Sequence, residues 1–304
     1  MSRYAIRDHI STLDPESDYE EIARLLVAHE FPWDTVQSLS FALFRTYAVP
    51  SIGDLLYDTT ELITRTQKRY DDTVLILDAA VEHGMASAEG RAAIRRMNQM
   101  HGAYDISNGD FLYVLSTFVV MPVRWINEYG WRRLTDVETA GITNYYRELG
   151  KRMNIKDIPQ TYAAFSDFLD AYEAEHFAYT NKTRAVAEAT LRLLAELPPN
   201  KYAPRALVRW FSFGLMDDPL VDAFRYERPS RLARRIATGA LRLRARIVRL
   251  LPPRKKPYYS RQMPSIQSYP CGYRVEDLGT FPACPRLRAG EGSERPVAGE
   301  ARSA

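Results

Sequence analysis

Apolar residues recur every three to four positions along most of the chain, which is the spacing of helices with one buried face. Residues 61–80 illustrate the pattern, because one helical face collects the mostly uncharged positions Leu62, Thr66, Arg69, Thr73, Ile76, Leu77 and Ala80. The aspartates of this stretch, Asp71, Asp72 and Asp78, fall mostly elsewhere. No convincing run of alternating β-branched residues predicts a strand. We therefore expect an all-α fold.

Two capping residues and one apolar stretch predict the helices between residues 87 and 123. Ser87 is placed to cap a helix that runs to about residue 104, and Asp110 is placed to cap the next one. Residues 111–123 are apolar and nearly uncharged. A membrane-spanning helix needs about 20 such residues, so this stretch is expected to be a buried core helix.

Three further helices are expected after residue 130. Thr135 and Glu138 have the spacing of a capping box for a helix through residue 149, which Gly150 would end. Residues 162–172 and 183–197 repeat the helical spacing, and two prolines follow the second of these ranges.

The C-terminal part differs in composition. Residues 229–251 predict a basic helix, which the next two prolines end, and residues 257–285 are rich in Pro, Tyr and Ser. From residue 287 the composition is typical of a disordered tail. We expect one large helical domain over residues 18–282 and a tail over 287–304.

Length and composition are those of a globular protein. The chain has 304 residues, of which 46% are hydrophobic and 26% charged, enough for a sizeable core. No apolar segment near the N-terminus predicts a secretory signal. Cys271 and Cys284 lack the spacing of a disulfide framework or a zinc site. A cytoplasmic protein is expected.

Charge is unevenly distributed. The net charge is +3, but residues 224–261 hold thirteen Lys or Arg against the single acid Glu227, about +12, so the remainder carries −9. The helix in this segment has an apolar side formed by Leu232, Ile236, Ala240, Leu243, Ile247 and Leu250. That pattern is typical of a helix lying on a membrane, and an anionic leaflet would attract the arginines. Alternatively, the apolar side packs on the domain. Nucleic acid is disfavoured, because no docking motif accompanies the charge.

Histidines are few enough to be weighed singly. His9 and His29 lie in or beside polar turns that we expect to be exposed, and His83 ends a helix, where the macrodipole favours a cation. His101 shares a helical face with Ile94, Met97 and Tyr104, so its ring is expected to point inward. It is either a hydrogen-bonded core residue or a ligand. Gly102 would let a flat cofactor approach closely, or it interrupts the helix.

Arg69 and Thr73 lie one helical turn apart on an otherwise apolar face. A buried guanidinium needs an anionic or acceptor partner, either a nearby carboxylate or a cofactor carboxylate. Glu173 and His176 have the Glu-x-x-His spacing of di-iron helix bundles, but that site needs a second copy and none is found. The chain has no Gly-rich phosphate loop, no His-Glu-x-x-His and no Gly-x-Ser-x-Gly.

Several stretches resemble the catalytic domain shared by MpaB, MpaB′ and the rubber oxygenases. They are RYDDTVLIL from Arg69, VEHGMASAEGRAAIRRMNQMHGAYDISNGDFLYVLSTF from Val81, PVRWINEYGWRRLTDVE from Pro122, YYRELGKRMNIKDIPQTY from Tyr145 and SYPCGYRVEDLG from Ser268. The resemblance covers about residues 30–200 and 262–280, with its pieces in the family's order. The likeness is closer to MpaB than to the rubber oxygenases.

The resemblance implies an all-α fold around haem b, a pocket Arg-x-x-x-Thr pair that matches Arg69 and Thr73, and an iron-ligating histidine that matches His101. In the latex-clearing branch a lysine precedes the threonine and can cap the iron; here Asp72 stands there, so no such cap is expected and rubber is disfavoured as substrate. The implied function is oxidative C=C cleavage, with O2, of an apolar, isoprenoid or lipid-like substrate. Aromatic residues of 111–118 would line its channel.

Two other functions remain open at this point. One is a non-catalytic helical protein that binds lipid or a membrane surface, and the other is a haem protein with different oxidative chemistry, which the departure at Asp72 allows.

Overall fold

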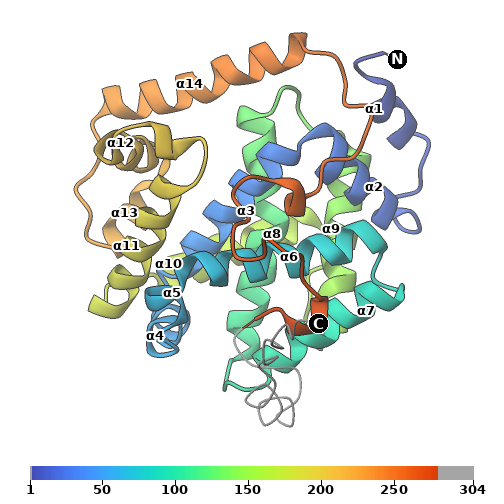
Figure 1. Cartoon of the computed structure of the whole chain (residues 1–304). Coiled ribbons are helices and arrows are strands. Elements are labelled where there is room, and N and C mark those ends of the chain that lie inside the picture. The colour runs from blue at the N-terminus through green and yellow to red at the C-terminus, as the bar shows by residue number, and fades with distance from the viewer. Residues whose placement is uncertain (1, 280–304) are drawn as a thin grey trace, which may run out of the picture.

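The computed structural model describes residues 2–279, and within that range it contains helices and loops but no strand, which confirms the all-α prediction. Figure 1 shows α8 in the middle of the molecule and α14 along one edge. The α-helices are α1 Ala5–Ile10, α2 Tyr19–Leu25, α3 Pro32–Thr46, α4 Pro50–Asp58, α5 Glu61–Thr64, α6 Thr66–His83, α7 Ala88–His101, α8 Asn108–Tyr129, α9 Asp136–Arg152, α10 Tyr162–His176, α11 Asn181–Glu196, α12 Arg205–Leu215, α13 Asp218–Ala223 and α14 Arg231–Leu250. A π-helical turn, Leu26–Glu30, and the 3-10 turns Asn200–Tyr202, Ser260–Gln262 and Val275–Asp277 complete them. Cys284 and the predicted tail, 287–304, lie outside the described residues.

The central helix α8 begins earlier and ends later than predicted. Ser107, not Asp110, is its N-cap, because the Ser107 hydroxyl accepts the Asp110 N–H at 3.0 Å. The helix also continues through Pro122, where a proline ordinarily breaks a helix by removing a hydrogen bond and clashing with the preceding turn. Most of its side chains are buried between α3, α9, α10 and α14, and this packing offsets the local cost of Pro122.

By length and composition alone, α8 is long and apolar enough to cross a membrane, because it spans 22 residues. The apolar stretch seen in the sequence was shorter. However, 72% of its most apolar window is buried inside the structure. Such burial favours the interpretation as a core helix.

The helix expected over residues 61–80 is broken in two. Arg65 has φ −132° and ψ 44°, outside the helical region, and it separates α5 from α6. The Thr66 hydroxyl donates at 2.8 Å to the Leu62 carbonyl, the acceptor that a continuous helix would give to the Thr66 N–H. Arg69 and Thr73 both lie in α6, so the break leaves their one-turn spacing intact.

Two predicted N-caps are confirmed. Ser87 caps α7 by accepting the Gly90 N–H at 2.9 Å, although α7 ends at His101 rather than near residue 104. Thr135 and Glu138 form the expected capping box of α9.

Gly150 does not end α9. The helix continues to Arg152, and a Cβ at Gly150 would lie 2.5 Å from Leu115 Cδ2 on α8. The glycine is therefore required for the close approach of two core helices. In the sequence, the same glycine resembled the residue that ends a helix.

The segment of residues 259–279, called here the C-terminal strap, lies along α6 and α7 (Figure 1). Asp71 accepts the backbone N–H groups of Gln267 and Ser268 at 3.0 and 2.8 Å. Asp78 accepts those of Ser260 and Arg261 at 3.0 and 3.2 Å. The α6 aspartates, which the helical pattern places mostly off the uncharged face, are thus buried beneath the strap.

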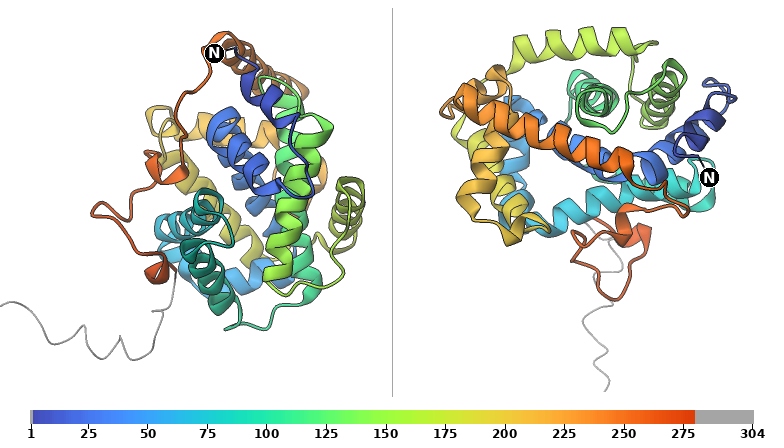
Figure 2. Two further views of the ribbon diagram at one scale, coloured as in Figure 1. Left: turned by 90° about the vertical axis from the view of Figure 1, so that its right-hand side faces the viewer. Right: turned by 90° about the horizontal axis from the view of Figure 1, so that it is seen from above.

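Helix α14 does not pack through the apolar side seen in the sequence, so the alternative that this side packs on the domain is wrong. Its buried residues are Ala233, Ala237, Leu241 and Ala245. The alanine side meets α12, where a Cβ on Gly214 would come within 2.8 Å of Ala237 Cβ. The larger apolar residues that the sequence placed on one side face away and are exposed, whereas Leu241 is buried. Figure 2 shows the helix crossing one face of the molecule as its outer layer.

Candidate functional site

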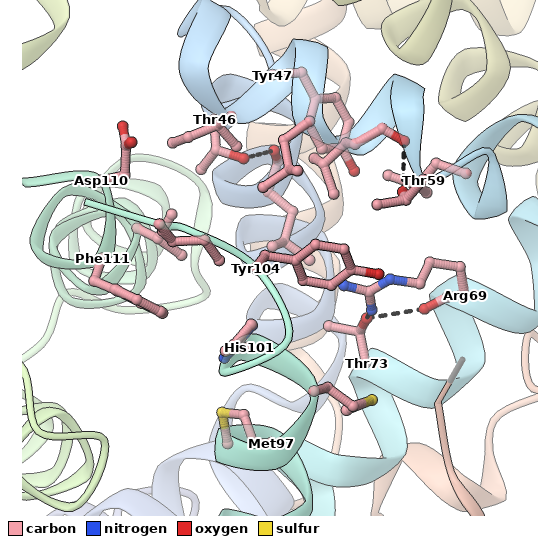
Figure 3. Close-up of a pocket in the computed structure, with 18 of the residues that line it drawn as sticks. Thr46, Tyr47, Thr59, Arg69, Thr73, Met97, His101, Tyr104, Asp110 and Phe111 are labelled. Atoms are coloured by element: carbon pink, nitrogen blue, oxygen red, sulfur yellow. Dashed lines mark hydrogen bonds between the residues drawn. The ribbon is translucent and has the colours of Figure 1, made fainter. Parts of the chain in front are cut away.

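A cavity of about 470 Å³ lies between α3, α4, α6, α7, α8, α9 and α11. Its wall exposes more apolar than polar surface, and its polar side chains come from several helices and from the loop after α7. Figure 3 shows Arg69 and Thr73 on one side of it, Phe111 and Asp110 on the other, and His101 with Met97 between them. A volume of this order is usual for small-molecule sites, about 300–1,000 Å³.

His101 is the last residue of α7, and its imidazole lines the cavity. Its Nδ1 is buried, and no hydrogen-bond partner for it lies among residues 2–279. Burial and, to a smaller extent, the nearby charge of Arg69 lower the pKa of His101 to about 4. The imidazole is therefore neutral near pH 7, which is the form that ligates metals. Gly102 follows the helix as its C-cap and is not part of the cavity wall.

Arg69 and Thr73 extend from α6 into the same cavity. The Arg69 guanidinium donates to the Thr73 hydroxyl, which in turn donates at 2.8 Å to the Arg69 carbonyl. Within the described range no ion pair includes Arg69, although a carboxylate partner was one expectation for it. A half-buried cation without a carboxylate at a cavity wall favours an anionic ligand group.

Apolar side chains of α8 form another wall. Of the three aromatic residues of 111–118 expected to line a channel, Phe111 and Phe118 reach the cavity, together with Val114 and Leu115. Tyr113 does not line it and instead donates to the buried Glu173. The Phe111 ring lies 5.4 Å from the His101 ring, centroid to centroid, and edge-on to it. This wall holds His101 in a poorly solvated position, which explains the depressed pKa.

Several polar residues of the wall were not predicted. Tyr47, Tyr70, Tyr104 and Thr190 line the cavity from four separate parts of the chain. Asp110, considered only as a helix cap, is buried there, and its carboxylate accepts hydrogen bonds from Ser51, Ser107 and Tyr172 at 2.8, 2.9 and 3.0 Å. Helical spacing had placed only Tyr104 beside His101; the tertiary structure alone brings the others to the cavity.

The other histidines lie away from the cavity wall. His9 is exposed and pairs with Glu21, as expected for a polar turn. His29 was expected to be exposed, but it is half-buried, and burial is the main reason that its pKa is lowered. His83 is the last residue of α6 and is exposed. His176 stacks on Tyr172, with ring centroids 4.0 Å apart.

Glu173 and Asp72 have structural partners. Glu173 forms a buried ion pair with Arg45 and accepts the Tyr113 hydroxyl at 3.1 Å. Asp72 is buried outside the cavity wall, where it pairs with Lys68 at 2.8 Å and accepts the hydroxyl of Tyr269 in the strap. The position that carries a lysine in the latex-clearing branch thus serves to anchor the strap here.

Comparison with known proteins places this chain in a family. The family model described as "ER-bound oxygenase mpaB/B'/Rubber oxygenase, catalytic domain" matches residues 36–250, which include Arg69, Thr73 and His101. The chain belongs to this family. The resemblance read from the sequence is thereby confirmed, and the matched segment is an oxygenase catalytic domain.

Relatives in the mpaB/rubber-oxygenase family include fungal proteins. The ER-bound oxygenase mpaB' of Penicillium brevicompactum is 33% identical over 253 residues, which cover 77% of this chain and 58% of that protein. The ER-bound oxygenase mpaB of Penicillium roqueforti is 28% identical over 241 residues, covering 73% and 80%. The mpaB of Penicillium brevicompactum is 31% identical over 193 residues, covering 58% and 48%. The chain thus spans little more than half of the first relative.

Proposed function

We propose that this chain is a haem b-dependent oxygenase in which His101 ligates the iron. The observation that supports the proposal is the presence, in one apolar cavity, of a buried His101 nitrogen without a hydrogen-bond partner and an Arg69 cation without a carboxylate among the described residues. Haem requires an axial ligand from the protein, and its propionates favour a cationic partner. The residues present therefore fit the cofactor.

Each residue has a distinct proposed role. His101, neutral because its pKa is depressed, offers an unprotonated nitrogen to the iron. Arg69 pairs a propionate or orients the pocket, and Thr73 holds the guanidinium through the hydrogen bond between the two side chains. When bound, haem b supplies the O2 chemistry, and the protein supplies ligation, orientation and exclusion of water.

The proposed substrate is apolar, of isoprenoid or other lipid-like character, and the proposed reaction is oxidative cleavage of one of its C=C bonds. Phe111, Val114 and Phe118 present an apolar wall beside His101. Burial of hydrocarbon against such a wall contributes about 25 cal/mol per Å² of apolar surface. A charged substrate would find little on this wall to compensate for lost hydration.

A membrane surface is the proposed working place of the protein. The relatives are named ER-bound oxygenases, and an apolar substrate partitions into lipid. The basic segment 224–261 is the proposed point of contact.

The first experiment is spectroscopic. The protein is expressed with haem supply, and its absorption spectrum and pyridine haemochrome are recorded alongside His101→Ala and His83→Ala. We expect a Soret band near one haem per chain in the wild type and in His83→Ala, which lacks an exposed histidine. In His101→Ala the band should be lost or shifted.

Isoprenoids are then incubated with the loaded protein under O2, and carbonyl fragments are sought by mass spectrometry. A His101→Ala protein that keeps full haem and full activity would overturn the ligand assignment. A correctly folded but colourless wild type would leave a helical lipid-binding protein as the better account.

A further inference from the structure

Helix α14 exposes a continuous apolar stripe on its outer side. The stripe consists of Leu232, Ile236, Leu243, Ile247 and Leu250, each 47–85% exposed, with Ala240 between them. These residues recur at helical spacing over the whole length of the helix, about 30 Å for 20 residues. The alanine side already satisfies the packing of α14 on the domain, so the stripe has no partner among the described residues.

Unpaired arginines lie along one edge of this stripe. Helical spacing places Arg231, Arg235, Arg242, Arg246 and Arg249 there, and all of them are exposed. Only Arg242 has an ion-pair partner within residues 2–279, Glu128 at 3.1 Å. The arginines on the other sides are engaged, since Arg234 pairs with Asp218 and Arg244 with Asp34. Four cations beside the stripe are therefore free to meet an external anion.

The combination of an apolar centre with a cationic edge limits what can cover α14. A second copy of this chain would bring two arginine rows together, and like charges repel. Nucleic acid would meet the cations but would leave the leucines and isoleucines without an apolar partner. An anionic lipid surface satisfies both, because acyl chains receive the stripe and headgroups receive the arginines.

We propose that α14 is the element by which this protein docks on an anionic lipid surface, with the stripe inserted among the acyl chains. The exposed Arg254, Lys255 and Lys256 follow the helix directly and extend the cationic edge. This inference rests on the membrane location proposed above. The face of α14 that contacts lipid and the charge of that lipid are not measured by the haem or product assays described above.

Vesicle co-sedimentation of the full chain tests the charge requirement. Binding to phosphatidylcholine vesicles is compared with binding to vesicles that also contain phosphatidylserine. The variant Arg235→Gln/Arg246→Gln/Arg249→Gln should bind the anionic vesicles about 100-fold more weakly, since each basic residue contributes about 1 kcal/mol there and 1.4 kcal/mol is tenfold.

The matched control is Arg95→Gln/Arg133→Gln/Arg192→Gln. These three arginines are also exposed and have no ion-pair partner within the described range, so the net charge changes equally. A nonspecific effect of net charge would weaken both triple variants alike, whereas docking through α14 should leave the control close to the wild type.

A second variant, Leu243→Gln/Ile247→Gln, tests the stripe. Both side chains are more than half exposed, so their replacement should leave the haem spectrum and circular dichroism unchanged. Vesicle binding should fall at least about tenfold, because two aliphatic side chains no longer insert.

Equal binding to neutral and anionic vesicles, or a control triple variant as weak as the α14 triple variant, would overturn the proposal. A concentration-dependent dimer that disappears in the stripe variant, without vesicle binding by the wild type, would assign the stripe to a second copy instead. Vesicle binding requires neither bound haem nor turnover, so either result is separable from failure of the oxygenase proposal.

Discussion

Replacement of Asp71 by alanine removes the carboxylate that holds the C-terminal strap on α6. Asp71 is fully buried. One oxygen, Oδ2, accepts the backbone N–H groups of Gln267 and Ser268, and the other accepts the side-chain amide of Gln67 at 2.8 Å. Asp71→Ala therefore removes the acceptor of two strap N–H groups.

The expected cost follows from these contacts. A hydrogen bond to a charged group contributes about 1.5–3 kcal/mol, so two backbone bonds sum to about 3–6 kcal/mol. Local movement of the strap would let the freed N–H groups reach water, which favours the lower half of that range. We expect a loss of about 3–4 kcal/mol, a large share of a typical unfolding free energy of about 5–15 kcal/mol.

Urea denaturation followed by circular dichroism measures the free energy of unfolding, and limited proteolysis reports release of the strap. Asp167→Ala on α10 is the matched control, because Asp167 is exposed and has no ion-pair partner within the described residues; it should change stability by no more than about 0.5 kcal/mol. A loss below about 1 kcal/mol in Asp71→Ala, with no new cleavage in the strap, would refute the reasoning.

Three further predictions concern the core and the cavity. The folded-state pKa of His101, about 4, lies below its unfolded value near 6.5. Haem-free wild type should therefore lose about 2 kcal/mol of stability between pH 7 and pH 5, a loss that His101→Leu should not show. Equal dependence of the unfolding free energy on pH in the two proteins, measured by urea denaturation, would contradict this. Gly150→Ala places a methyl group 2.5 Å from Leu115 Cδ2 and should cost about 1–3 kcal/mol, measured as a lower melting temperature. Arg132→Ala leaves the buried carboxylates of Glu30 and Glu138 without their cationic partner. The free energy of unfolding should fall by about 3–5 kcal/mol; a melting temperature unchanged within error would show that the buried network is dispensable.

The helical architecture was predictable because its signals are local. Ser87 and Thr135 each cap a helix through a residue three positions later, and that spacing is visible in the sequence. The one-turn spacing of Arg69 and Thr73 and the inward face of His101 are equally local. The sequence also identified the family, since the stretches that resemble it lie in order over most of the chain.

Contacts between distant segments decided what the local pattern could not. The helical pattern places Asp71 and Asp78 off the uncharged face, but the strap, nearly 200 positions later, buries both of them. Pro122 lies within a continuous helix because α8 is buried on several sides. Gly150 resembled a helix end but serves the approach of α8 and α9.

The cavity and the outer face of α14 also show which features are local and which depend on tertiary contacts. The periodicity of apolar residues shows that a helix has an apolar side, but it does not show what that side packs against. For α7 it meets a cavity that brings His101 within reach of the Arg69 charge. For α14 the alanines and Leu241 pack, and the large apolar side chains of the stripe remain exposed; at the close approach to α12, a Cβ on Gly214 would lie 2.8 Å from Ala237 Cβ. The sequence determined which helices form and which side chains they carry, whereas the tertiary structure alone decided which faces are buried.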